Sequence, residues 1–189
     1  MSRFQVLADR PRLALGALLT LLLATAAVVG SGADFTASSA NPSNTFASGT
    51  LTIANSKEGT AVLTATGLRP GGTAATGTVD IKNSGTLSGG FTVSRSTPVD
   101  SDSANPLSGM LNLTIVDCGT FVGATAPTCD DTDDTMYTGT IAAMTGNKAL
   151  GTYAGGEQHR YQFTVSLDSS AGNAYQGGNS SVKFDWNAA

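Results

Sequence analysis

Several segments of the chain alternate apolar and polar side chains with a period of two. The clearest covers residues 160–168, where every second side chain from Tyr161 to Leu167 is apolar. Such alternation predicts a β-strand with one buried face. The same pattern predicts further strands at residues 51–53, 62–65, 79–81, 91–93, 111–115, 137–141 and 181–187.

Short runs rich in glycine, asparagine and proline separate these segments, at residues 69–72, 83–85, 146–148, 171–173 and 177–179. Such runs are typical turn signals. No stretch beyond the N-terminal region has apolar residues at helical spacing over a substantial length. About eight strands joined by turns predict an all-β fold, an antiparallel β-sandwich, with residues 120–135 as its longest loop.

The N-terminal region has a different pattern. Arg3, Arg10 and Arg12 precede an apolar run of 17 residues, 13–29, and small residues follow at 31–33. This order predicts a helical secretory signal peptide, residues 1–33, that is cleaved between Ala33 and Asp34. Cleavage after Gly32 is the second choice, and an uncleaved membrane anchor is the alternative, since 17 residues lie at the lower limit for a membrane span.

Removal of the leader leaves residues 34–189, which we expect to form a single domain with an extended N-terminal segment at 34–48. This part keeps seven of the ten basic residues and thirteen of the fourteen acidic ones. Its net charge is therefore about −6, and it has no basic surplus to neutralise phosphates. Nucleic acid is excluded as an expected partner, as is a membrane once the leader has been removed.

Cys118 and Cys129 are the only cysteines, and both belong to the exported part. In an oxidising compartment their default state is a disulfide, which would close a small loop. A structural metal site would need further cysteine or histidine ligands nearby, and the sequence has none there.

His159 is the only histidine, so the paired histidines of a typical zinc peptidase are missing. It could be a lone metal ligand or a general base, but an edge-strand histidine without chemical role is the preferred interpretation. The sequence also lacks a Gly-x-Ser-x-Gly nucleophile motif and a phosphate-binding Gly-x-x-x-x-Gly-Lys-Ser/Thr loop. We therefore expect no enzymatic activity, no catalytic residue and no cofactor.

Four carboxylates lie within five residues next to the second cysteine, at Asp130, Asp131, Asp133 and Asp134. Their oxygens are of the kind that calcium prefers, although the spacing is not that of an EF-hand. The preferred interpretation is a solvated loop that keeps a protein of low charge soluble, with calcium binding as the alternative.

Four motifs occur in a recognisable order after the leader: NTFASGTLTI at 44–53, LRPGG at 68–72, VDIKNSG at 79–85 and GNAYQGG at 172–178. Together they resemble the TasA/camelysin family of secreted bacterial proteins, over roughly residues 13–189. The resemblance implies a jelly-roll sandwich, export through a dedicated signal peptidase, and a role in extracellular fibres or the biofilm matrix. It also implies a second possibility, because camelysin has been described as a casein-cleaving metalloendopeptidase. The segment around Cys118 and Cys129 departs from the family pattern.

Two functions remain open. In the first, the protein is a fibre subunit that self-associates by adding residues 34–48 to a neighbour's sheet, with Asp34 at the start of the segment and Phe35 and Phe46 as anchors. The same segment could instead be a leader without contacts. In the second, the protein is a monomeric cell-surface module that uses the loop at residues 120–135 to bind a ligand or a protease.

Overall fold

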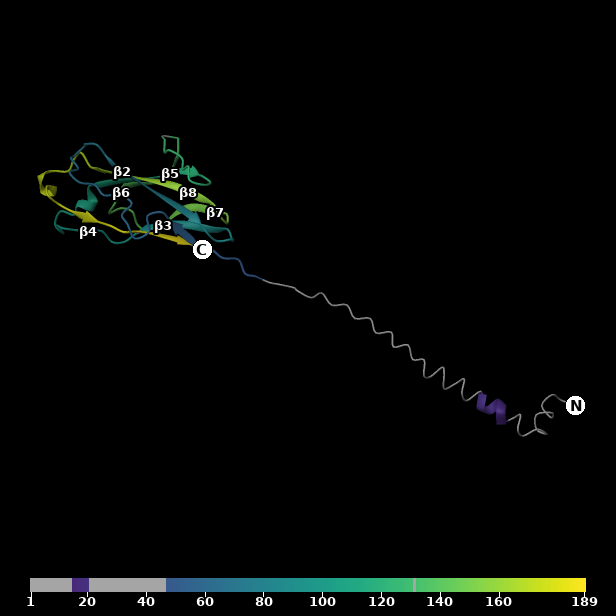
Figure 1. The fold of residues 1–189 in the computed structure, drawn as a ribbon. Coiled ribbons are helices and arrows are strands. Elements are labelled where there is room, and N and C mark those ends of the chain that lie inside the picture. The colour runs from purple at the N-terminus through teal and green to yellow at the C-terminus, as the bar shows by residue number, and fades with distance from the viewer. Residues whose placement is uncertain (1–14, 21–46, 131) are drawn as a thin grey trace. The chain divides into compact units, whose positions relative to one another are not determined.

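A computed structural model describes residues 15–20, 47–130 and 132–189 (Figure 1). Residues 15–20 are helical, and they belong to a first unit, Met1–Phe46, while Ala47–Ala189 form a second compact unit. In the described residues, no helix has the length and apolarity needed to cross a membrane. The predicted cleavage site and the predicted anchors Phe35 and Phe46 lie outside the described residues.

The second unit is all-β, with antiparallel strands in three sheets. A five-stranded sheet has the order β1 (Ile53–Asn55), β2 (Ala75–Asn83), β8 (Gln158–Leu167), β5 (Leu111–Thr120), β6 (Asp134–Thr140). A three-stranded sheet has the order β10 (Phe184–Ala188), β3 (Gly89–Arg95), β7 (Lys148–Tyr153). The third pairs β4 (Val99–Asp100) with β9 (Ser180–Ser181), and the 3-10 helices η1 (Leu107–Gly109) and η2 (Asn173–Tyr175) lie in connections.

One hydrophobic core joins the two larger sheets. The five-stranded sheet contributes inward side chains from β2, β5 and β8, and the smaller sheet contributes side chains from β3 and β7. Fully buried members of this core include Ile81, Ile115, Phe163, Val93 and Tyr153. The period-two alternation therefore predicted β2, β3, β5 and β8 correctly, and the expected all-β sandwich is confirmed. The jelly-roll topology implied by the family resemblance stays a prediction.

Three predicted strands differ from the structure. The strand predicted at 51–53 begins only at Ile53 and continues to Asn55. Residues 62–65 form no strand. Instead Val62 and Leu63 pack against the core, where Gly77 of β2 leaves room for the Val62 carbonyl. The segment predicted at 181–187 divides into β9 and β10 because the two parts pair with different strands, β4 and β3.

The sequence pattern also missed β7. Its six residues include Gly151, whose φ is 108°, and the pairing with β3 shifts register opposite it, between Phe91 and Thr92. An alternation interrupted by a glycine in this conformation is difficult to detect in a single sequence.

Candidate functional site

His159 lies near the start of β8, the central strand of the five-stranded sheet. β8 pairs with β2 on one side and with β5 on the other, so the edge-strand interpretation of His159 was wrong. The side chain is only 14% exposed. The physical reason is that alternation reports only which face of a strand is buried, whereas an edge or central position depends on which strands pair with it.

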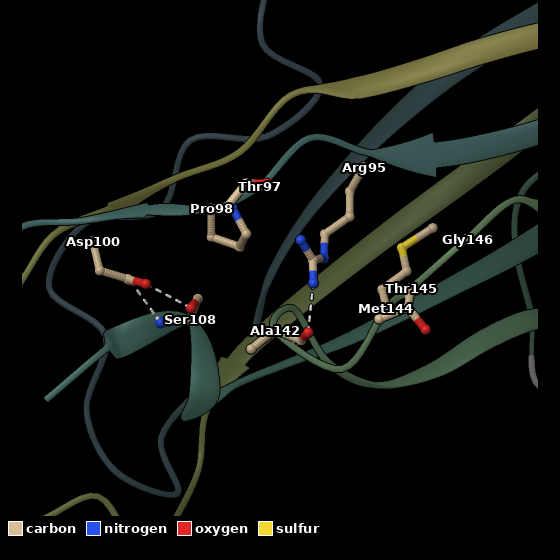
Figure 2. Close-up of a pocket in the computed structure, with 9 residues that line it drawn as sticks. All are labelled: Arg95, Thr97, Pro98, Asp100, Ser108, Ala142, Met144, Thr145 and Gly146. Carbon is tan, nitrogen blue, oxygen red and sulfur yellow. Dashed lines mark hydrogen bonds between the residues drawn. The ribbon is translucent and has the colours of Figure 1, made fainter. Parts of the chain in front are cut away.

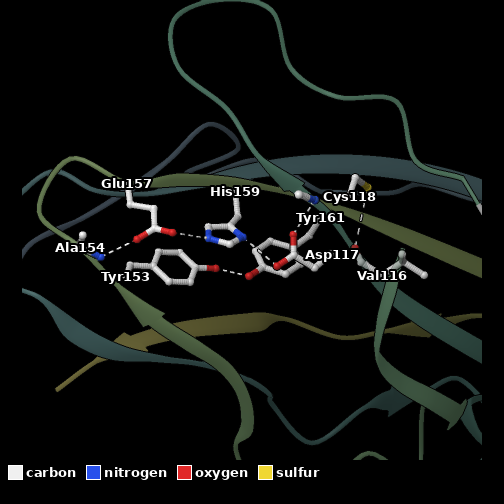
Figure 3. Close-up of polar contacts among 9 residues, drawn as sticks. Val116, Asp117, Cys118, Tyr153, Ala154, Glu157, His159 and Tyr161 are labelled. Atoms are coloured by element: carbon white, nitrogen blue, oxygen red, sulfur yellow. Dashed lines mark hydrogen bonds and ion pairs between the residues drawn. The ribbon is translucent and has the colours of Figure 1, made fainter. Parts of the chain in front are cut away.

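Two carboxylates hold the imidazole from opposite sides (Figure 3). Nδ1 lies 2.7 Å from Oδ2 of Asp117, and Nε2 lies 3.2 Å from Oε1 of Glu157. Asp117 comes from β5, and Glu157 from the turn between β7 and β8. Each carboxylate is fixed by a backbone donor, since Gly119 donates to Asp117 at 2.9 Å and Ala154 donates to Glu157 at 2.6 Å.

The imidazole also belongs to an aromatic stack. Its ring lies 4.2 Å from the ring of Tyr153, centroid to centroid, at an interplanar angle of 18°. Tyr153 stacks in turn on Phe91 at 4.2 Å, and its hydroxyl contacts the hydroxyl of Tyr161. Burial raises the pKa of both tyrosines, so their phenols stay neutral at ordinary pH.

Burial by itself would lower the pKa of His159. The hydrogen bond and the charge of Asp117, followed by those of Glu157, outweigh this effect and raise the pKa above its usual value. The imidazole thus bridges β5 and the turn that precedes β8, and we call this arrangement of Asp117, His159 and Glu157 the clamp. Because both ring nitrogens contact carboxylates, neither is available as a metal ligand or as a base for a nucleophile. The expected lack of peptidase activity stays a prediction.

We expect the stability of the domain to fall as pH rises through the folded-state pKa of His159. A raised folded-state pKa contributes stability that is complete below the unfolded-state value and is lost above the folded-state value. The free energy of unfolding should therefore be larger at about pH 6 than at about pH 9. Urea unfolding at both pH values checks this, together with NMR titration of the single imidazole. The variant His159→Gln should remove most of the difference, and an equal difference in that variant would contradict the clamp.

The predicted disulfide is confirmed. Cys118 and Cys129 are bonded, with Cα atoms 4.6 Å apart, and they close the loop between the end of β5 and the start of β6. Asp133 lies close to the two sulfur atoms, but these are bonded to each other and are not thiolate ligands.

The acidic residues after Cys129 form a turn. The backbone N–H of Asp130 donates to Oδ2 of Asp133 at 2.7 Å, and Oδ1 of Asp130 accepts two hydrogen bonds from Thr132. Asp134 begins β6, and Asp131 lies outside the described residues. These bonds hold the turn itself, and calcium binding by the four carboxylates stays a prediction.

Sequence reasoning overlooked Arg95, which lies in a depression of about 550 Å³ (Figure 2). Arg95 follows Phe91 and Val93 in the same alternation, and this was the available signal that it faces inward. Its guanidinium donates to the carbonyls of Ser96 and Ala142. It thereby fastens the β6–β7 connection to the end of β3, and two of its N–H groups are used for this structural contact.

On the opposite wall of this depression, the carboxylate of Asp100 accepts hydrogen bonds from the backbone N–H and the hydroxyl of Ser108, at 2.8 and 2.7 Å (Figure 2). These bonds connect β4 to η1. Both charged groups of the depression therefore serve local structure.

A comparison with protein-family models and with characterised protein sequences finds no match for this chain.

Proposed function

We propose that the protein is a secreted structural subunit that assembles into extracellular fibres by strand addition. The observation that carries the proposal is the edge strand β6, seven residues long, at one end of the five-stranded sheet. In the described part of the chain, β6 pairs with β5 alone, so the backbone groups on its other side have no strand partner. Such an edge is a template for a further strand.

The pairing of β5 with β6 indicates which groups are open. Ile141 donates to the carbonyl of Leu111 at 2.8 Å, and hydrogen-bonded pairs alternate along an antiparallel ladder. Leu113 and Gly139 are then the next hydrogen-bonded pair, and Thr138 lies opposite Thr114 in a pair without mutual hydrogen bonds. The N–H and C=O of Thr138 therefore point away from β5, toward an added strand.

The chain enters the domain at the opposite side of the same sheet. Residues 47–50 are exposed, and the Thr50 carbonyl accepts hydrogen bonds from Thr86 and Leu87 just before β1, the other edge strand. Residue 47, where the second unit begins, thus lies near one edge of the sheet, while the open edge of β6 lies at the other. Donation from one copy to the next would be head-to-tail, and such contacts generate filaments when they do not close into a ring.

A monomeric surface module is the second candidate. It is favoured by the disulfide-closed loop, in which the apolar side chain of Val122 is 98% exposed. A binding loop held on a rigid sandwich is a common way to present such a contact.

Substitution of the edge residue Thr138 tests the fibre proposal. Thr138→Pro removes the outward N–H but no hydrogen bond of the β5–β6 ladder, so the exported protein should fold and form no filaments in negative-stain microscopy. Thr138→Val is the matched control, because it keeps the N–H and a β-branched side chain, and it should form filaments as the wild type does. Equal filaments from the proline variant would exclude β6 as the acceptor. A wild-type protein that stays monomeric at every concentration would favour the surface module.

A further inference from the structure

The outer face of the five-stranded sheet carries rows of neutral polar side chains. The register places Thr76 of β2 beside Thr164 of β8, Thr164 beside Thr114 of β5, and Thr114 beside Thr138 of β6. Neighbouring strands lie about 4.8 Å apart, so four threonines form a continuous row across the sheet.

The next row is also uncharged. It consists of Thr78, Gln162, Val116 and Thr135, paired in the same strand order. In the row beyond, Arg160 forms a two-point ion pair with Asp80, at 2.7 and 2.9 Å. The inward positions of these strands are apolar because they form the core, so the uncharged outer rows are a separate feature of the sheet.

The disulfide loop makes one part of this face concave. A groove of about 340 Å³ has a floor of side chains from the two neutral rows and a wall from the loop. The floor residues are Thr114, Val116, Thr135, Gln162 and Thr164, and the wall residues are Cys129, Asp130 and Asp133. The disulfide fixes the wall to β5, because Cys129 is bonded to Cys118.

The groove has hydrogen-bonding capacity that the protein leaves unused. In the described part of the chain, Oδ2 of Asp130 and Oδ1 of Asp133 accept no hydrogen bond, although the other oxygen of each carboxylate does. Within the same residues, no hydrogen bond engages the side chains of Thr114, Gln162 or Thr164. Donors and acceptors are thus placed side by side on a rigid strand floor, with strong acceptors on the wall.

We propose that this groove binds a short segment of a neutral polysaccharide. A neutral polyhydroxylated ligand supplies hydroxyl donors to Asp130 and Asp133, and both donors and acceptors to Gln162 and the threonines. No groove-lining residue is cationic, which disfavours phosphate and acidic glycans. Val116 is the only aliphatic side chain of the lining, which disfavours lipids and apolar peptides. The volume is at the lower end for ligand pockets and suits one or two sugar rings.

Titration calorimetry of the exported protein tests the proposal with four neutral oligosaccharides: maltotetraose, cellotetraose, mannotetraose and chitotetraose. Tetragalacturonic acid is the charged comparison, and all titrations contain EDTA. At least one neutral probe should bind, and the acidic probe should bind at least about tenfold more weakly. Failure of all four neutral probes to bind at about 10 mM would overturn the proposal.

Three variants locate the site. Thr164→Val and Asp133→Asn should each weaken binding by about tenfold or more, because each removes a hydrogen-bonding group from the groove at nearly constant shape. Thr76→Val is the matched control: it makes the same change in the same row, outside the groove, and should bind as the wild type does. Equal affinity in all three variants, or binding that appears only when calcium replaces EDTA, would refute direct recognition by the groove. Filament formation by Thr164→Val should be normal, so this result is independent of the fibre proposal.

Discussion

Deletion of residues 34–40 from the protein that lacks residues 1–33 is expected to abolish filament formation completely. This segment is the proposed donor strand, and without it the edge of β6 in a neighbouring copy has nothing to pair with. The domain should still fold, because the first strand of the second unit begins at Ile53 and, among the residues that the structure describes, its core consists of residues from Leu51 onward. Circular dichroism and negative-stain microscopy of the two proteins check the two parts of this expectation.

A matched control separates the effect of the sequence of residues 34–40 from the effect of the length of this segment. Replacement of residues 34–40 by a glycine–serine segment of equal length removes Phe35 and the strand propensity but keeps the reach of the chain. It should prevent filaments as the deletion does. Filaments from the deleted protein would exclude this donor, whereas an unfolded deleted protein would mean that the segment belongs to the core of its own domain.

Gly77→Ala is expected to cost about 3 kcal/mol of unfolding free energy or more, the upper end for an overpacked core. A methyl group at Gly77 would overlap the carbonyl oxygen of Val62, and it would lie 3.1 Å from Cβ of Leu63. The obstacle is backbone, which cannot rotate away as a flexible side chain can. The segment around Val62 would have to leave its position under β2, and chemical denaturation measures the cost.

Gly90→Ala is the matched control for this substitution. Gly90 is also a strand glycine, in β3, but the nearest atom to its added methyl group would be the carbonyl oxygen of Ala189 at 3.8 Å. The domain should keep its stability or gain roughly 0.5 kcal/mol, since alanine restricts the unfolded chain. Similar losses in both variants would show that strand glycines are intolerant in general and that the contact with Val62 is not the cause.

The sequence predicts a strand well where apolar and polar residues alternate clearly within the segment itself. β8 alternates without interruption and β5 alternates from Leu111 to Ile115, and the structure places both strands inside the larger sheet. Residues 62–65 have a similar local pattern without forming a strand, because their position depends on a glycine in another segment. β7 forms a strand although its own residues show no clear alternation. Its pairing with β3 contains a register shift, which its sequence does not predict.

The candidate sites also differ in whether a local sequence pattern or contacts with distant segments determine them. Two cysteines behind a predicted secretory leader suffice to predict the disulfide, since the sequence has no other cysteine. The environment of His159 could not be predicted, because its carboxylates come from another strand and from a turn. The groove depends on the register of three strands and on where the loop lies. Such placements arise from long-range pairing, which a single sequence does not encode in any local pattern.

The intrinsic fluorescence of Trp186 can be used to follow the contact between the two larger sheets. This residue is the only tryptophan, and it lies on β10 of the smaller sheet with its ring 5.5 Å from Tyr161 and 6.2 Å from Phe163, both on β8 of the larger sheet. Its fluorescence should therefore respond to the separation of the two sheets, and neither of these two neighbouring rings belongs to the disulfide loop. Emission and excitation transfer from Tyr161 follow this separation in the unlabelled protein.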